Sequence, residues 1–226
     1  RNGAVDHGLE GVLEEAVQLD RLRAAHLGED PLDLGGEGRE VRCPLLPRMS
    51  CGIVSPMNAT TNDGRRVDLN PDALDALRAR VRGPVLLPGD DGYEDSRTVW
   101  NAMIDRRPAA VVRCLGSADV VSCVQFAGEH DLLLCIKVGG HNIAGLAAAD
   151  GALMLDMSRM RGVWVDPSAR IARAQAGCLL GDVDRETQLH GRAPVLGFVS
   201  ATGITGLTLG GGFGYLTKRW GGRRTT

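Results

Sequence analysis

The sequence predicts an α+β fold in which a β-α-β subdomain is combined with a second, mixed α/β subdomain. Residues 108–138 indicate the first part, because a β-branched run, a helix-spaced segment and another apolar run follow one another within about 30 residues. Residues 152–191 indicate the second part, with three short strand-like runs before one helical segment. Two glycine-rich segments, 139–145 and 203–214, interrupt this pattern.

Bulk composition excludes several classes of protein. The 226 residues are 43% hydrophobic, which is enough for one sizeable domain or two small ones. A net charge of −2 gives no general reason to expect a nucleic acid or an anionic membrane as partner. The chain has no apolar run of about 18 residues, and its acidic start does not resemble a secretory signal. We therefore expect a cytoplasmic protein.

The cysteines do not indicate a metal site. No two of the six stand in C-x-x-C spacing, and no histidine pair lies beside them. Scattered cysteines without a secretory signal are more often reduced and buried as small apolar residues. This interpretation applies to Cys43, Cys51, Cys114, Cys123, Cys135 and Cys178.

The first half of the chain changes character at Met57. Residues 1–56 contain one amphipathic helical pattern that ends at Gly28 and then many helix breakers, so we expect a non-native or disordered extension. Residues 57–107 are expected to form a helical lead-in. Its helix is predicted in 70–83, where Asn70 is the N-cap, a proline follows and a glycine ends the pattern.

The β-α-β unit is predicted in three pieces: a strand in 108–114, a helix that begins with Ser117 as its N-cap, and a strand in 132–138. The second strand ends at the first glycine segment. His141 is thereby placed at the C-terminal end of a strand, where α/β folds commonly bind ligands.

After this unit the pattern becomes a series of strands. Runs at 152–158, 162–166 and 170–177 are separated by turn signals. One further helix is predicted in 179–191, where Gly191 ends it.

Neither glycine segment is a common nucleotide motif. Neither contains the P-loop motif G-x-x-x-x-G-K-[ST]: Gly206 to Gly211 have the glycine spacing, but Gly212-Phe213 stands where Lys-Ser/Thr would be. The segment 139–145 lacks the G-x-G-x-x-G spacing and the following helix of a dinucleotide fingerprint. Glycines still allow backbone N–H groups to converge on an anion. Two such segments in one domain suit an extended ligand with a pyrophosphate, such as a dinucleotide; the alternative is that each is a tight turn.

Three stretches together carry a family resemblance: "IKVGGHNIAG", the strand pair "DMSRMRGVWVDP" and "VSATGITGLTLGGGFGYL". In this order they resemble the FAD-binding domain of the vanillyl-alcohol oxidase/p-cresol methylhydroxylase (PCMH) superfamily, in its berberine bridge enzyme-like branch. The resemblance covers about 70–219 and is best from 108 onward. It implies a PCMH-type FAD-binding domain in 108–219 and a flavin-dependent oxidoreductase that passes hydride to flavin N5, with O2 as acceptor.

The resemblance also implies site residues. In that family the GGH loop wraps the FAD pyrophosphate, and its histidine carries the flavin through an 8α-linkage; His141 matches that position. Two alternatives for His141 stay open, a non-covalent polar contact to FAD and a solvent-facing loop residue. A second, cysteinyl link of some members would fall on Val199, so we expect at most one link. The cofactor-binding candidates are Gly139, Gly140, His141, Asn142, Ile143, Ala144, Gly145, Ser200, Thr202, Gly203, Gly206, Gly210 and Gly211.

The chain departs from the family at its end. Family members continue beyond this point with more of the FAD domain and a substrate domain, so we expect an incomplete C-terminus and an aberrant tail in 220–226. No catalytic residue is identifiable, and the partners implied are FAD and a small-molecule alcohol, sugar or alkaloid-like substrate. The alternatives are a truncated, non-catalytic remnant and a binding module for another nucleotide. Trp100 and Trp164 are interpreted as core or edge packing, and His130 and His190 as helix C-terminal residues.

Overall fold

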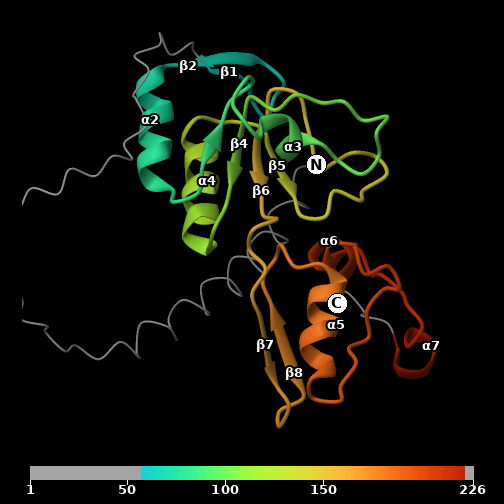
Figure 1. Cartoon of the computed structure of the whole chain (residues 1–226). Helices are drawn as coiled ribbons and strands as arrows, with labels where there is room; N and C mark the ends of the chain where they lie inside the picture. Colours follow the sequence, from blue (N-terminus) through green and yellow to red (C-terminus); the bar gives the residue numbers. More distant parts are fainter. Residues whose placement is uncertain (1–56, 222–226) are drawn as a thin grey trace, which may run out of the picture. The chain divides into compact units, whose positions relative to one another are not determined.

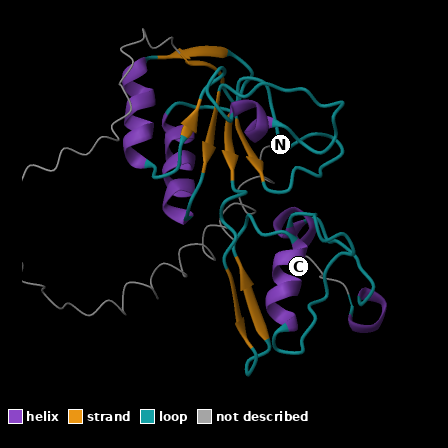
Figure 2. Cartoon of the chain, viewed as in Figure 1, coloured by secondary structure: helices purple, strands orange, loops and turns teal. Residues whose placement is uncertain are grey.

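The computed structural model describes residues 57–221 (Figure 1; Figure 2). It begins with an antiparallel hairpin, β1 (Met57–Thr60) and β2 (Arg66–Leu69). The segment expected to be a helical lead-in thus contains strands as well as helices. The helical pattern predicted before Gly28 lies outside the described residues, as do Cys43 and Cys51.

Helix α2 (Pro71–Arg80) begins as predicted, because the Asn70 side chain accepts a hydrogen bond from the backbone N–H of Ala73 at 2.8 Å. The helix ends at Arg80, before Gly83. Gly83 has a different reason to be glycine: a Cβ there would lie 2.0 Å from the carbonyl oxygen of Arg113. The close approach of two backbones, and not a helix stop, requires this glycine.

A four-stranded sheet forms the centre of the first subdomain. Its order is β3 (Val85–Leu86), β4 (Ala110–Arg113), β6 (Leu153–Asp156) and β5 (Leu134–Lys137). Strands β4, β6 and β5 are parallel, and β3 is antiparallel to β4. The run 152–158, which the sequence grouped with the two strands after it, therefore supplies the strand between the two strands of the predicted β-α-β unit.

Helices cover both faces of this sheet. Helix α4 (Ser117–Glu129) follows β4 and packs against β6. Its N-cap is Gly116, so Ser117 is the first helical residue and not the cap that we expected. On the other face, α3 (Tyr93–Arg97) packs against β4 and β6. The apolar cluster on this face consists of Tyr93, Val99, Val111, Cys135, Ala147, Ala148, Ala152 and Met154.

The second subdomain is a hairpin with helices. Strands β7 (Val163–Asp166) and β8 (Ile171–Ala174) pair antiparallel, and α5 (Leu180–Gln188) packs against both. Two short helices follow, α6 (Ile204–Leu209) and α7 (Thr217–Trp220). The helix predicted in 179–191 ends at Gln188, and Gly191 has a φ of 61° just beyond it.

Four cysteines of the described chain, Cys114, Cys123, Cys135 and Cys178, are buried free thiols, as the sequence predicted. Among residues 57–221, no helix combines the length and apolar character that crossing a bilayer requires.

Candidate functional site

The first glycine loop leaves strand β5 and runs through residues 138–145. Gly140 and Gly145 have φ values of 67° and 71°, a conformation that favours glycine. A Cβ on Gly145 would also lie 2.7 Å from Cγ2 of Ile104. The loop path therefore depends on these two glycines.

The backbone donors of this loop are available. Within the described part of the chain, no N–H group of residues 139–144 donates a hydrogen bond. Backbone N–H groups are strong donors that seek partners, and a series of them along a curved loop attracts an anion. The carbonyl groups are used differently: Gly140 accepts from Trp100 N at 3.1 Å, and Ile143 accepts from Asn101 Nδ2 at 3.1 Å.

The second segment is held by the turn before α5. Leu180 N donates to the carbonyl of Thr202 at 2.9 Å, and Ile204 N donates to the carbonyl of Cys178 at 2.9 Å. This segment was expected to be one long glycine loop. Instead, residues 204–209 form α6, and Gly203 is its N-cap. Only the parts before and after α6 are loop.

The two segments meet backbone to backbone. A Cβ on Gly139 would lie 2.6 Å from the nitrogen of Gly203, and a Cβ on Gly203 would lie 2.7 Å from the nitrogen of Gly139. Real Cβ atoms do not come so close to a backbone atom. This junction therefore requires glycine on both sides.

The candidate residues differ in exposure. Gly140, Gly145 and Gly203 are buried, and their role is to shape the backbone. Half-buried and exposed candidates line the accessible sides of the two loops. The half-buried set is Gly139, His141, Thr202 and Gly211; the exposed set is Asn142, Ile143, Ala144, Ser200, Gly206 and Gly210. Gly210 and Gly211 follow α6, and neither makes a close contact with Gly139 or Gly203 among the described residues.

Trp100 lies beside His141, a contact that sequence reasoning missed. The two rings are stacked, with centroids 5.7 Å apart and planes 22° apart. Trp100 is 65% exposed and Trp164 is 50% exposed, so of the two expected roles, core or edge packing, the core role is wrong for both. The segment around it has no helical or strand period. The only sequence signal was an aromatic residue next to an amide, Trp100-Asn101, in a segment without regular structure.

A row of charged residues stands at the C-terminal ends of the parallel strands. Arg113, Asp156 and Lys137 are paired in register across β4, β6 and β5. Nε of Arg113 lies 3.4 Å from Oδ2 of the buried Asp156, and Nζ of Lys137 donates to the carbonyl of Ser96 at 2.6 Å. Burial lowers the pKa of Lys137. This row fixes the strand ends from which the first loop departs.

No group of three or more potential metal-ligating side chains occurs within the described residues. The second segment does contain an open hollow of about 230 Å³, lined by Gly197, Phe198, Val199, Thr202, Leu207, Gly212 and Phe213. Its lining is mostly apolar and lies next to the glycine junction through Thr202.

Comparison with protein families gives a match to the FAD binding domain over residues 108–225, just over half of the 226 residues. (R)-6-hydroxynicotine oxidase of Paenarthrobacter nicotinovorans is 34% identical over 141 residues, 62% of this chain and 31% of that protein. FAD-linked oxidoreductase pgmH of Aspergillus terreus is 38% identical over 165 residues, 71% of this chain and 33% of that protein.

Solved structures agree with these relatives. Glucooligosaccharide oxidase of Acremonium strictum, whose FAD is described as 6-S-cysteinyl, 8α-N1-histidyl, matches with a TM-score of 0.62 and 30% identity over 66% of this chain and 32% of that one. Berberine bridge enzyme-like structures match as well. The matches confirm the superfamily and the fold class indicated by the motifs. The chain spans about a third of the length of the relatives it matches.

Proposed function

Because the chain belongs to the FAD binding domain family, we propose that its two glycine loops hold FAD and that His141 carries the flavin covalently in a flavin-dependent oxidoreductase. The observation that supports this most is the junction of Gly139 with Gly203. It joins two loops that are far apart in sequence into one backbone surface. His141 stands two residues after Gly139.

The backbone of the first loop suits a pyrophosphate. The N–H groups of residues 139–144, which donate to no acceptor in the described part of the chain, offer donors without side chains in the way at Gly139 and Gly140. No lysine or arginine of this loop is needed, because backbone donors alone can bind phosphate oxygens. Ser200 and Thr202 add hydroxyl groups on the second loop.

His141 suits the role of attachment residue. A neutral imidazole nitrogen is a competent nucleophile toward an activated methyl group. The link is a net two-electron oxidation: a C–N bond replaces one C–H of the flavin 8α-methyl and one N–H of the imidazole, and two electrons and two protons pass to dioxygen. The histidyl flavin of the glucooligosaccharide oxidase supports this assignment.

When bound, FAD supplies the two-electron oxidation of substrate, with hydride accepted at N5. The residues of this chain bind and orient the cofactor. We propose that the whole protein oxidises an alcohol, sugar or alkaloid-like small molecule and uses O2 as acceptor. The named relatives, which oxidise a nicotine derivative and an oligosaccharide, support a small-molecule substrate.

The test is the visible spectrum of the full chain purified from cells or reconstituted with FAD. We expect a yellow protein whose flavin stays with the polypeptide after acid precipitation. The His141→Ala variant should lose the acid-stable flavin. A chain that stays colourless with excess FAD, or a His141→Ala variant that keeps acid-stable flavin, would contradict the proposal.

The same backbone donors would also support a second candidate function, the binding of another nucleotide, because they could donate to its pyrophosphate oxygens as well. Titration calorimetry with FAD, ADP and NAD separates the two. We expect FAD to bind at least about tenfold more tightly than either competitor, because only FAD brings the flavin ring to His141. Equal affinities would favour a general nucleotide-binding module.

A further inference from the structure

Trp100 and Asn101, in the first subdomain, contact successive parts of the first glycine loop. Trp100 N donates to the Gly140 carbonyl, the Trp100 ring stacks on His141, and Asn101 Nδ2 donates to the Ile143 carbonyl. Backbone, ring and amide thus contact residues 140, 141 and 143 in turn. Such a series of contacts fixes the register of the two segments, so the Trp100 ring has a defined place beside the imidazole.

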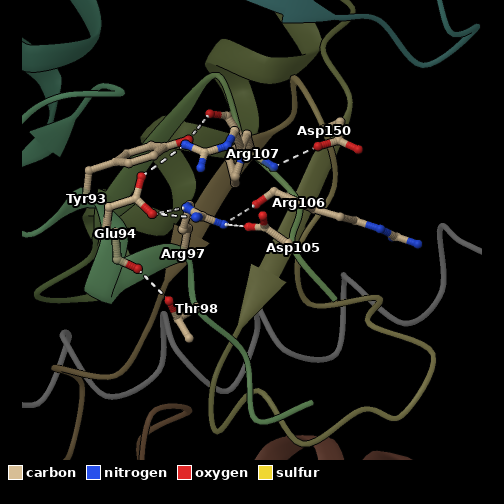
Figure 3. Close-up of polar contacts among 9 residues, drawn as sticks. Tyr93, Glu94, Arg97, Thr98, Asp105, Arg106, Arg107 and Asp150 are labelled. Atoms are coloured by element: carbon tan, nitrogen blue, oxygen red, sulfur yellow. Dashed lines mark hydrogen bonds and ion pairs between the residues drawn. The ribbon is translucent and has the colours of Figure 1, made fainter. Parts of the chain in front are cut away.

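The segment before and after Trp100 is anchored by Arg97 (Figure 3). The Arg97 guanidinium pairs with Glu94 on its own helix and with Asp105 beyond Trp100, and it also donates to the Arg106 carbonyl at 3.1 Å. Its side chain is only 10% exposed. These bonds join the residues before and after segment 98–104. We call these joined residues, 94–97 and 105–106, the base of the loop.

Arg106 connects this base to the glycine loop. Its Nη1 donates to the carbonyl of Ala148 at 3.0 Å and to that of Gly145 at 3.4 Å. Tyr93, at the start of α3, also holds the base, because its hydroxyl donates to the Pro108 carbonyl at 2.6 Å. The loop that carries Trp100 and the loop that carries His141 are therefore bonded at both ends.

We infer that Trp100 is a positioning residue, which sets the plane of the His141 imidazole for attachment of the flavin. The inference rests on the proposed covalent link through His141. An unrestrained histidine rotates about two side-chain bonds, and only some orientations point a ring nitrogen at a neighbouring carbon. A stacked indole removes most of these orientations, because turning the imidazole out of the stack loses the ring contact.

The alternative is that Trp100 only covers the surface. Its high exposure and its polar neighbours would then make it an ordinary edge residue. The two roles differ in what a substitution changes. If Trp100 only covers the surface, substituting it should lower stability and total FAD binding together. If Trp100 positions His141, substituting it should slow covalent attachment while the amount of FAD bound stays the same.

The first experiment uses the flavin-free chain. The imidazole covers part of the Trp100 ring, so removing it should let a small neutral quencher reach this indole more easily. Acrylamide should therefore quench the tryptophan emission of His141→Ala more strongly than that of wild type, while in a Trp100→Leu background the same substitution should change nothing. Equal quenching of wild type and His141→Ala would overturn the contact on which the inference depends.

The second experiment follows acid-stable flavin over time after FAD is added. Trp100→Leu should slow attachment about tenfold, the size expected for a lost aromatic pair, while total FAD bound stays within about twofold of wild type. Trp100→Phe should restore most of the rate, because it restores a ring over the imidazole. Trp164→Leu is the matched control, since it removes an exposed indole that stacks on Arg173 instead.

The outcomes separate this inference from the proposed function. The positioning role is wrong, and the His141 link stands, if wild type and Trp100→Leu attach flavin equally fast. The same conclusion follows if the attachment rate of Trp100→Leu falls only as much as its total FAD binding falls. If wild type forms no acid-stable flavin, the link and the positioning role both fall.

Discussion

The two glycine loops of the site are supported to very different degrees. Residues 137–145 are bonded to the segment 96–106 through Lys137, Trp100, Asn101 and Arg106. Residues 210–220 instead expose large apolar rings, with Phe213 68%, Tyr215 86% and Trp220 66% exposed. The first loop is thus preorganised by its own subdomain. The second segment is hydrogen-bonded to Ala176, Cys178 and Leu180 near its start, whereas the apolar rings that follow α6 stay exposed.

The largest effect is expected where the two loops join. Gly139→Ala places a Cβ 2.6 Å from the Gly203 nitrogen, so one backbone must move. Overpacking of this kind costs about 1–3 kcal/mol, and we expect FAD affinity to fall by up to about 100-fold in calorimetry.

The matched control for this substitution is Gly128→Ala, which meets no atom within 4 Å in an exposed part of α4. It should leave FAD binding unchanged and raise the free energy of unfolding by at most about 1 kcal/mol. Equal FAD affinity in Gly139→Ala and in wild type would contradict the account of the junction.

A moderate effect is expected from the anchor of the first loop. Arg97→Met removes two ion pairs and leaves the Arg106 carbonyl without a partner, so we expect the free energy of unfolding to fall by about 2 kcal/mol in urea denaturation. Arg185→Met, which removes an exposed pair with Glu186, should cost about 0.5 kcal/mol or less. Similar losses in both variants would show that Arg97 is not a structural anchor.

The ion pairs of Arg97 also predict that the free energy of unfolding depends on pH. Hydrogen bonds from Arg97 lower the pKa of Glu94 and of Asp105 in the folded chain. Groups with lowered pKa stabilise the fold above the ordinary carboxyl pKa of about 4, and this contribution is lost as the pH falls through the lowered values. Unfolding between pH 6 and pH 2 should therefore show a smaller acid loss in Arg97→Met than in wild type; parallel curves would argue against this coupling.

The smallest effect on stability is expected in the second loop. The rings of Phe213 and Tyr215 contact Phe198, at 5.4 Å and 5.6 Å between centroids, but remain largely exposed. Phe213→Ser with Tyr215→Ser should lower the free energy of unfolding by at most about 1 kcal/mol and reduce binding of a hydrophobic dye. A loss comparable to that of Arg97→Met would mean that both loops are equally built into the fold.

The parts of the fold that sequence predicted well are those with a local cause. The Asn70 cap and the first turn of α2 depend on neighbouring residues, so spacing alone identifies them. The glycine loop with His141 was identified for a similar reason, since its glycines and histidine stand within one short stretch. These residues remain proposed FAD contacts.

The parts that sequence could not predict depend on contacts between distant residues. An apolar run such as that of β6 does not specify which strands it pairs with, so its place between β4 and β5 was not foreseen. The stacking of Trp100 on His141 joins two segments without regular structure, and no period marks such a contact. Gly203 was expected in a loop, but only three-dimensional packing makes it the N-cap of α6 and the partner of Gly139.

The central claim is that His141 tethers the flavin at the junction of the two loops. Trypsin digestion of the yellow chain, followed by mass spectrometry, tests it directly, because cleavage after Lys137 and Arg159 leaves His141 as the only histidine of its peptide. We predict that this peptide carries the mass of FAD less two hydrogens and that fragmentation assigns the addition to His141. Flavin on another peptide, or this peptide recovered only in unmodified form from a chain with acid-stable flavin, would contradict the claim.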